Sequence, residues 1–506
     1  TQVVVEKRLK ASEGKSRHDL GREKFLERVW EFKEEHAGFI HHQLRRIGSS
    51  LDWTRERFTM DPHCQKAVTE AFVKLHEDGK IYRATRLVNW CCALQSAISD
   101  LEVEFDDVEK NAKVRIPGYD KAVDMGALTH IAYKVTGSDE ELVIATTRPE
   151  TLLGDTAVAI HPEDKRYKHL HVKITPAHDP NDFESGKRHN LEEITIMDMK
   201  GYITMEGEFK GLHRFDCRKA LVKALEDKKL LRGVEPYSYR VGRCSRTGDI
   251  IEPLLMPQWF VDCKEMAERS VAAVRNKELK LTPESHEAVW YHWLENIKPW
   301  CVSRQLWWGH RIPAYQVALN GSPTGEWVVA RDDEEAKKKA IEQLKLKKED
   351  AEKIELTQDP DVLDTWFSSA LWPFSTMGWP DKTPDMELFF PGSLLETGHD
   401  ILFFWVARMV MASFHFMDKL PFKEVYLHAM VRDKEGRKMS KSLGNVIDPL
   451  DVITGIELEK LHEKVENGNL DPKEVPKAIK YQKQAFPKGI DKCGSDALRF
   501  GLLSYT

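Results

Sequence analysis

The chain has 506 residues, a length that fits roughly three domains or one large domain carrying an insertion. Hydrophobic residues make up 41% and charged residues 31%, with a net charge of −6, which excludes a disordered chain and a globally basic nucleic-acid coat. The eight cysteines exclude a disulfide scaffold and indicate a reducing compartment.

The first 100 residues predict helices that alternate with strands. Apolar residues recur at helical spacing across residues 25–47, and Gly48 predicts the end of that helix. A second helix is predicted at 68–75 with its end at Gly79, and a strand follows at 86–91. This alternation favours an α/β layered fold.

Between residues 113 and 240 the sequence changes to β-branched runs separated by turns, which predicts a compact β-rich insert. Strands are expected at 142–147, 157–160, 172–175 and 194–197. A tryptophan-rich stretch follows. The α/β character then returns, with a helix that begins near His399 and a strand at 424–431.

Two segments allow a membrane or nucleic-acid interpretation, and we favour neither. Residues 401–416 are apolar but short for a membrane span and carry Arg408 near their middle, so we predict a buried helix and no membrane partner. The lysine-rich run 334–350 has a single apolar stripe, which favours a surface helix over a nucleic-acid arm.

Common nucleotide and metal motifs are incomplete. Gly14-Lys15-Ser16 resembles the end of a phosphate-binding loop, but Leu9 stands where the first glycine is required. His286-Glu287 lacks the second histidine of a zinc protease. Neither Cys91-Cys92 nor Cys244 belongs to a CxxC pair, so we predict structural cysteines and no metal site.

The strongest chemical signal is Lys438-Met439-Ser440-Lys441-Ser442, which follows a predicted strand and a turn. Two lysines around a small, serine-rich core form a cationic loop suited to pyrophosphate, whereas an isolated pair of this kind would be a solvated basic turn. Gly398-His399-Asp400 lies between a strand and a helix. That position is either an ordinary helix start or a ligand site at the edge of a sheet.

These features resemble the class I aminoacyl-tRNA synthetases, whose KMSKS signature is similar to residues 438–442. Further segments narrow the resemblance to the valyl-tRNA synthetase family of eukaryotic type, and it covers essentially the whole chain. The segments are 395–401 (Leu-Glu-Thr-Gly-His-Asp-Ile), 364–369 (Asp-Thr-Trp-Phe-Ser-Ser), 300–315, 146–151 (Thr-Thr-Arg-Pro-Glu-Thr) and 173–182.

The resemblance implies an α/β fold in which a parallel, Rossmann-like nucleotide-binding sheet is split by a β-barrel editing insert, with a helical stem at the C-terminus. Residues 1–110 would form part of the first half of the catalytic domain, and 111–245 a shortened editing domain. Residues 246–450 would form the second half with the KMSKS loop, and 451–506 the stem and the start of a helical anticodon-binding domain.

The resemblance also implies ATP-dependent activation of valine and its transfer to tRNA(Val). Lys438 and Lys441 would be catalytic, neutralising the leaving pyrophosphate, with Mg²⁺ sharing that task. Trp366 would pack against the valine side chain. The residues implied for ATP binding are Gly398, His399, Asp400, Lys438, Ser440 and Lys441.

A second, hydrolytic site is implied by the insert. Threonine has nearly the shape of valine, and the apolar pocket of valyl enzymes is known to reject it by only about 10². The residues implied for editing of Thr-tRNA(Val) are Arg148, Thr151, Lys173, Thr175, Asp179 and Asp182. Arg148 and Lys173 would hold the terminal adenosine or phosphates, and Asp179 the ammonium or hydroxyl group of the substrate.

Three departures from the family pattern set our expectation for this chain. The HIGH-type ATP motif would precede Thr1, the editing strands expected between Leu170 and Val172 are missing, and the anticodon-binding domain would continue beyond Thr506. We therefore expect a chain incomplete at both ends and doubtful activity of the chain alone. A catalytically incomplete tRNA-binding fragment and a trans-editing hydrolase are the alternatives. A cytoplasmic location is expected, with a mitochondrial form also open, and the oligomeric state is not predicted.

Overall fold

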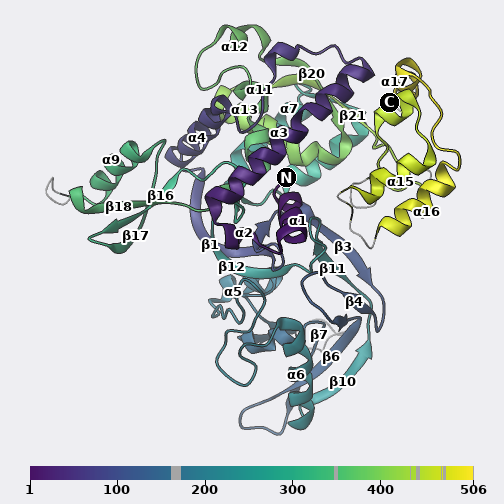
Figure 1. The fold of residues 1–506 in the computed structure, drawn as a ribbon. Helices are drawn as coiled ribbons and strands as arrows, with labels where there is room; N and C mark the ends of the chain where they lie inside the picture. The colour runs from purple at the N-terminus through teal and green to yellow at the C-terminus, as the bar shows by residue number, and fades with distance from the viewer. Residues whose placement is uncertain are drawn as a thin grey trace. The chain divides into compact units, whose positions relative to one another are not determined.

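The computed structural model describes residues 1–160, 172–346, 351–433, 435–439, 445–468, 470 and 474–504 (Figure 1). The chain divides into two compact units. The first comprises Thr1–Lys74, Cys263–Lys298 and Leu306–Thr506, and the second comprises Leu75–Asp262 and Pro299–Gln305. The second unit therefore interrupts the first in sequence, and both contain helices and strands, so the content is mixed α/β.

The first unit contains a parallel sheet. Its strands are β13 (Lys280–Thr282), β21 (Phe422–His428) and β20 (Gly392–Gly398), in the order β13-β21-β20. Val425 and Leu427 on the central strand are buried, as expected for a parallel sheet covered by helices. The strand predicted at 424–431 is thus confirmed, although it begins at Phe422 and ends at His428.

The apolar stretch after β20 is a core helix. It begins with a 3-10 turn at His399–Ile401, continues as a π-helix at Leu402–Ala407 and ends as α13 (Arg408–Met417), which packs on α7 (Lys264–Arg275). By length and composition alone the stretch His399–Met417 would be long enough to cross a membrane, but half of it is buried within the protein. The predicted buried helix is confirmed.

The two helices predicted near the N-terminus are confirmed, and the structure adds helices before them that were not predicted. Helix α3 (Arg22–Ile47) ends at Gly48, which adopts a positive φ of 87° and donates its N–H to the carbonyl of Arg45. Helix α4 (Pro62–Glu77) ends just before Gly79, at φ 68°. Helix α1 (Gln2–Glu13) packs on α3 in an apolar cluster whose members are Val5, Leu9, Phe25 and Val29, covered by Trp307 and Trp308.

A small antiparallel sheet, β17-β16-β18, also belongs to the first unit, and α9 lies alongside it (Figure 1). Its strands are β16 (Ala314–Leu319), β17 (Ser322–Val329) and β18 (Ile354–Gln358). Helix α9 (Asp333–Gln343) buries Ala336 and Ala340 against this sheet, which confirms the predicted surface helix with one apolar stripe. Residues 347–350 of that run lie outside the described residues.

Most of the other helices of the first unit are short. They are α2 (Arg17–Leu20), α8 (Glu287–Glu295), α10 (Thr365–Ala370), α11 (Trp372–Ser375), α12 (Pro384–Phe389), α14 (Pro449–Thr454), α15 (Leu458–Glu466), α16 (Val475–Ala485) and α17 (Ser495–Leu503). The last four show that the described residues after 448 are largely helical.

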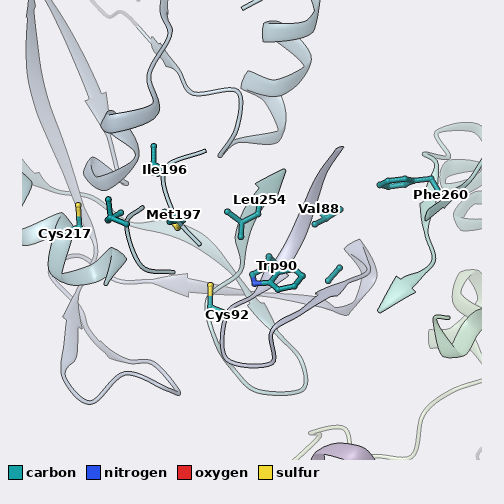
Figure 2. Close-up of a cluster of buried hydrophobic side chains, with 10 residues drawn as sticks. Val88, Trp90, Cys92, Ile196, Met197, Cys217, Leu254 and Phe260 are labelled. Atoms are coloured by element: carbon teal, nitrogen blue, oxygen red, sulfur yellow. The ribbon is translucent and has the colours of Figure 1, made fainter. Parts of the chain in front are cut away.

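The second unit is organised around a long antiparallel ladder. Strands β1 (Ile81–Cys91) and β12 (Glu252–Val261) pair from Ile81 opposite Val261 to Trp90 opposite Glu252, flanked by β2 (Ser96–Ile98) and β14 (Trp300–Cys301). One face of the ladder contributes to the buried cluster of Figure 2, in which the Trp90 indole donates to the carbonyl of Met199 at 2.7 Å. The cluster comprises Val88, Trp90, Cys92, Ala97, Ile196, Met197, Ile203, Cys217, Leu254 and Phe260.

The rest of the described part of the second unit contains small antiparallel sheets and the α-helices α5 and α6. The sheets are β10-β6-β7, β11-β3, β4-β5 and β8-β9. Their strands are β3 (Val103–Val108), β4 (Lys113–Arg115), β5 (Ala122–Asp124), β6 (Ala127–Lys134), β7 (Glu141–Thr146), β8 (Ala157–Ala159), β9 (Val172–Ile174), β10 (Leu231–Pro236) and β11 (Tyr239–Cys244). The helices, α5 (Pro180–His189) and α6 (Arg214–Asp227), were not predicted.

Three of the four strands predicted in the insert are confirmed by β7, β8 and β9. The fourth, at 194–197, is wrong: this segment forms only an isolated bridge between Met197 and Ile203. Its apolar side chains are buried in the cluster of Figure 2, and the Ile196 amide donates to His178 Nε2 at 3.1 Å. Burial in an irregular segment thus produced the same apolar signal as a strand.

Candidate active sites in the two units

The first candidate site lies at the carboxyl ends of β20 and β21, where parallel sheets commonly bind ligands. Gly398, the last residue of β20, pairs in register with His428, the last residue of β21. A Cβ at Gly398 would lie 2.7 Å from Asp400 Oδ1 and 2.7 Å from Met430 Sδ, so glycine allows the chain to turn closely into the helix. The adjacent π-helical turn is a common feature of functional sites.

His399 is held at this edge by its neighbours. Its Nδ1 lies 3.1 Å from the carbonyl oxygen of His428, and its ring stacks on that of His286 at 5.6 Å between centroids. Burial and the nearby His399 lower the pKa of His286. His428 Nε2 lies 3.0 Å from Glu396 Oε1. Sequence reasoning missed His286 and His428, because His428 lies inside the strand predicted at 424–431 and ends the strand only in the structure.

The loop after β21 reaches the same edge through a lysine. Lys438 Nζ donates to Asp400 Oδ2 at 2.6 Å, so the structure brings together two residues predicted for ATP binding. The turn is ordered by the buried Asp433, whose carboxylate accepts from Asn445 Nδ2 at 2.9 Å and from the amide and side chain of Arg437. Although burial opposes ionisation, these hydrogen bonds lower the pKa of Asp433 to about 2. Ser440 and Lys441 lie outside the described residues.

Trp366 approaches the helix that starts at His399. Asp364 accepts from the Trp366 amide at 3.5 Å and caps α10, which places the half-buried indole 5.4 Å from the ring of Phe404 on the π-helix. The Trp405 indole donates to the carbonyl of Ser369 at 3.0 Å and ties the same two segments together. An apolar surface therefore adjoins the polar edge formed by His399 and Asp400.

The second candidate site gathers three predicted residues around an aspartate that sequence reasoning missed. Asp155 Oδ1 accepts from Lys173 Nζ at 3.0 Å and from Thr175 Oγ1 at 2.5 Å, and Lys173 also donates to Thr175 Oγ1. Asp155 Oδ2 accepts from the Tyr133 hydroxyl at 2.6 Å. The Thr175 amide donates to Asp182 Oδ2 at 2.9 Å. The Gly-Asp-Thr turn between two predicted strands was the sequence signal for Asp155.

Asp179 and Asp182 differ in their surroundings. Asp179 is the N-cap of α5, where its Oδ1 accepts from the amides of Asn181 at 2.8 Å and Asp182 at 3.1 Å. Burial raises the pKa of Asp182, and the nearby Asp179 and Asp155 carboxylates act in the same direction, against the Thr175 hydrogen bond and the Lys173 charge. Asp182 is thus more readily protonated than an ordinary aspartate.

Arg148 is held by protein groups. Its guanidinium pairs with Glu252 on β12 and donates to the carbonyl of His178 at 2.9 Å. Thr151 Oγ1 donates to the Arg148 carbonyl at 2.9 Å, which closes the turn Pro149–Gly154. The structure therefore places Arg148 and Thr151 together at the start of this turn, with the arginine side chain anchored to β12.

Glu252 is the centre of a buried charge network. Besides Arg148, it accepts from Arg214 NH1 at 2.9 Å and lies 3.5 Å from His178 Nδ1, and Arg214 also donates to Asp249 at 3.1 Å. Burial alone would raise the pKa of Glu252, but Arg148, His178 and Arg214 hold it well below its usual range. Sequence reasoning missed this network because its members are scattered along the chain.

The predicted structural cysteines lie beside this network. The Cys91 thiol hydrogen-bonds Cys244, lies 3.2 Å from Thr247 Oγ1 and accepts from the Leu94 amide at 3.3 Å. Both cysteines are buried, and their mutual contact followed by burial raises the pKa of Cys91. Among the described residues, no group of three or more His, Cys, Asp or Glu side chains is arranged to hold a metal ion.

Several known proteins are similar to this chain, and those named below are all aminoacyl-tRNA synthetases. The family model "tRNA synthetases class I (I, L, M and V)" matches residues 1–506. The valine–tRNA ligase of Homo sapiens is 54% identical over all of this chain and 43% of its own length, and the mitochondrial valine–tRNA ligase of Saccharomyces cerevisiae is 53% identical over all of this chain and 49% of its own. The chain thus spans about half the length of these curated relatives. A leucyl-tRNA synthetase complex from Agrobacterium radiobacter K84 aligns with 90% of this chain and 64% of that chain at 16% identity and a TM-score of 0.40.

Proposed function

The chain belongs to the class I tRNA synthetases that act on isoleucine, leucine, methionine and valine, and on that premise we propose that the full-length protein is a valine–tRNA ligase. It activates valine with ATP, transfers it to tRNA(Val) and hydrolyses Thr-tRNA(Val). Identity above 50% to valine–tRNA ligases across the whole chain supports valine as the substrate.

One observation carries the adenylation proposal: Lys438 of the KMSKS-type loop contacts Asp400 at the carboxyl edge of the parallel sheet, at 2.6 Å. In the reaction a carboxylate oxygen of valine attacks the α-phosphorus of ATP, the bond to the bridging oxygen breaks, and pyrophosphate leaves. Lys438, with Lys441, neutralises charge on the pyrophosphate. His399 and Asp400 hold the adenosine, and Trp366 covers the valine side chain.

The editing proposal rests on the second candidate site. We assign Arg148, Thr151, Lys173, Thr175, Asp179 and Asp182 to it. The side chains of Lys173 and Thr175 meet at the Asp155 carboxylate. The Thr175 amide donates to Asp182, and the Asp182 amide donates to Asp179, which connects these two aspartates to the cluster. Polar groups of this kind can hydrogen-bond the threonine hydroxyl, which valine lacks, and such a site discriminates far better than an apolar pocket. The charged Lys173 also suits the terminal nucleotide of tRNA.

For the architecture we propose the family arrangement: a nucleotide-binding sheet split by an editing domain over residues 111–245, with a stem after residue 450. The parallel sheet, the small antiparallel sheets of the insert and the C-terminal helices support this proposal. We also propose a cytoplasmic location, with a mitochondrial form as the alternative because one relative is named as a mitochondrial valine–tRNA ligase.

The test is amino-acid-dependent ATP–pyrophosphate exchange by the full-length protein. We expect exchange with valine, reduced about 10²-fold or more by Lys438→Ala with little change in the KM for valine, because the charge is needed mainly in the transition state. Lys423→Ala, which removes an exposed lysine of β21, is the matched control and should leave exchange unchanged.

Other outcomes identify the competing functions. Hydrolysis of Thr-tRNA(Val) without any exchange would show a trans-editing hydrolase instead. Binding of tRNA without exchange or hydrolysis would show a catalytically incomplete tRNA-binding protein. Exchange with isoleucine in place of valine would contradict the assigned amino acid.

A further inference from the structure

The Asp155 carboxylate connects three polar side chains at the second candidate site. Its two oxygens accept from three side chains, those of Tyr133 at 2.6 Å, Lys173 at 3.0 Å and Thr175 at 2.5 Å. Tyr133 lies on β6 and Lys173 on β9, two different sheets of the second unit, and Thr175 directly follows β9. The side chains of Asp155 and Lys173 are only 7% and 10% exposed, so solvent screens this pair weakly.

The backbone that presents Asp155 is fixed by packing. Asp155 follows Gly154, where a Cβ would lie 2.9 Å from the carbonyl oxygen of Ile194 and 3.1 Å from Ile196 Cγ2. Ile196 is fully buried in the cluster of Figure 2, so the turn is pressed against the core. The Thr156 amide donates to the carbonyl of Ile174 at 3.0 Å and joins the turn to β9, which carries Lys173.

We propose that Asp155, oriented by Tyr133, is a positioning residue for the hydrolysis of Thr-tRNA: it holds the Lys173 ammonium and the Thr175 hydroxyl in the arrangement that the substrate meets. This inference rests on the proposed editing function and adds two residues to it.

The physical need for such a residue follows from the chemistry of lysine. The ammonium is a point charge on a flexible stem, and it interacts electrostatically with Asp182 as well as with Asp155. Without Asp155, Lys173 is free to form an ion pair with Asp182. Neither the ammonium nor the carboxylate would then be available to the substrate. The Asp155 carboxylate keeps Lys173 beside Thr175, and the Thr175 amide in turn holds Asp182 at 2.9 Å.

Tyr133 gives the carboxylate its orientation. Its hydroxyl donates to Oδ2, which leaves Oδ1 facing both Lys173 and Thr175. Burial, followed by the neighbouring Asp155, raises the pKa of Tyr133, so the phenol stays protonated and remains a donor throughout the working pH range. Tyr133 is therefore expected to act only through Asp155.

The test is single-turnover hydrolysis of Thr-tRNA(Val) by the full-length protein over a range of enzyme concentrations. Asp155→Asn should lower the rate at saturating enzyme about 10²-fold, as expected for misplaced groups, and leave the half-saturating concentration within about threefold. Tyr133→Phe should lower the saturating rate roughly tenfold, since it removes one hydrogen bond to a charged group. Lys173→Ala provides the reference for full loss of the lysine.

A double variant separates positioning from simple structural support. If Asp155 acts through Lys173, Asp155→Asn combined with Lys173→Ala should be no slower than Lys173→Ala alone. Tyr119→Phe is the matched control: Tyr119 donates to Asp216 at 2.7 Å in the same unit, and its removal should leave hydrolysis unchanged. Valine-dependent pyrophosphate exchange should be unaffected in every variant.

The two possible failures are distinguishable. A wild-type protein that does not hydrolyse Thr-tRNA(Val) would overturn the proposed editing function and this inference with it. Normal hydrolysis by the wild type, with Asp155→Asn equally fast or with multiplicative rate losses in the double variant, would overturn the inference alone.

Discussion

Lys438 and Lys173 are each held by one aspartate, yet their environments differ. Lys438 pairs with Asp400 while 53% of its side chain is exposed, and exposed pairs of this kind contribute about 1 kcal/mol or less. Lys173 pairs with Asp155 at 10% exposure, where a charge without its partner is much more costly. Lys438 can therefore leave Asp400 for a phosphate at small cost, whereas Lys173 is fixed in place.

A buried histidine of the first unit, His310, makes the stability of the protein depend on pH. Burial lowers the pKa of His310 from 6.5 to about 4, although the Thr59 backbone and Asp61 oppose it. Between these values the folded protein binds fewer protons than the unfolded chain, so His310 contributes stability above pH 6.5 that is lost as the pH falls toward 4. At about 1.4 kcal/mol per pKa unit the loss reaches about 3 kcal/mol.

The measurement is chemical denaturation of the wild type and of His310→Gln at pH 7 and pH 4. The wild type should lose about 3 kcal/mol more than the variant between the two pH values. Equal losses in the two proteins would show that His310 is not responsible for this pH dependence.

Asp179 gives a second prediction at this scale, because the structure makes it a helix cap. Asparagine accepts the same backbone hydrogen bonds, so Asp179→Asn should retain both stability and hydrolysis of Thr-tRNA(Val). Asp179→Ala should cost about 1 kcal/mol in the free energy of unfolding and slow hydrolysis. Slow hydrolysis by Asp179→Asn at unchanged stability would mean instead that the negative charge meets the substrate.

At the scale of whole elements, periodicity and helix-ending glycines carried the successful predictions. Helix α3 and its end at Gly48 followed from 26 residues of amphipathic sequence, and tertiary packing did not alter them. Helices α5 and α6 were missed because they lie in a region of short β-branched runs. The segment at 194–197 was mistaken for a strand because its burial comes from packing against β1 and β12, which are distant in sequence.

Strand β12 is joined to the Pro149–Gly154 turn through Glu252. We expect Glu252→Gln to lower the free energy of unfolding by about 3 kcal/mol or more, because Arg148 and the fully buried Arg214 each lose the buried carboxylate that they share. Glu141→Gln is the control: it breaks a pair with Arg232 in which about a third of each side chain is exposed. It should cost less than about 1 kcal/mol.

Denaturant titration of both variants provides the check. Similar costs for Glu252→Gln and Glu141→Gln would show that the buried network does not stabilise the second unit.

At the scale of the whole molecule, the two candidate sites belong to different compact units. Gly398, His399, Asp400, Trp366 and Lys438 are in the first unit. All six residues predicted for editing are in the second.

The motifs could be found from sequence because each is a short contiguous segment. Glu252 could not be given a role, because its contact with Arg148 joins segments 104 residues apart. Asp155 was missed because its partners lie outside its own short turn, 18 to 22 residues away.

We propose above all that one chain carries two chemistries in two separate units. The most direct test measures valine-dependent pyrophosphate exchange and Thr-tRNA(Val) hydrolysis side by side in the full-length wild type, Lys438→Ala and Lys173→Ala. We predict that Lys438→Ala loses exchange and keeps hydrolysis, while Lys173→Ala loses hydrolysis and keeps exchange. If either substitution reduced both reactions by the same factor, the assignment of the two activities to separate sites would be wrong.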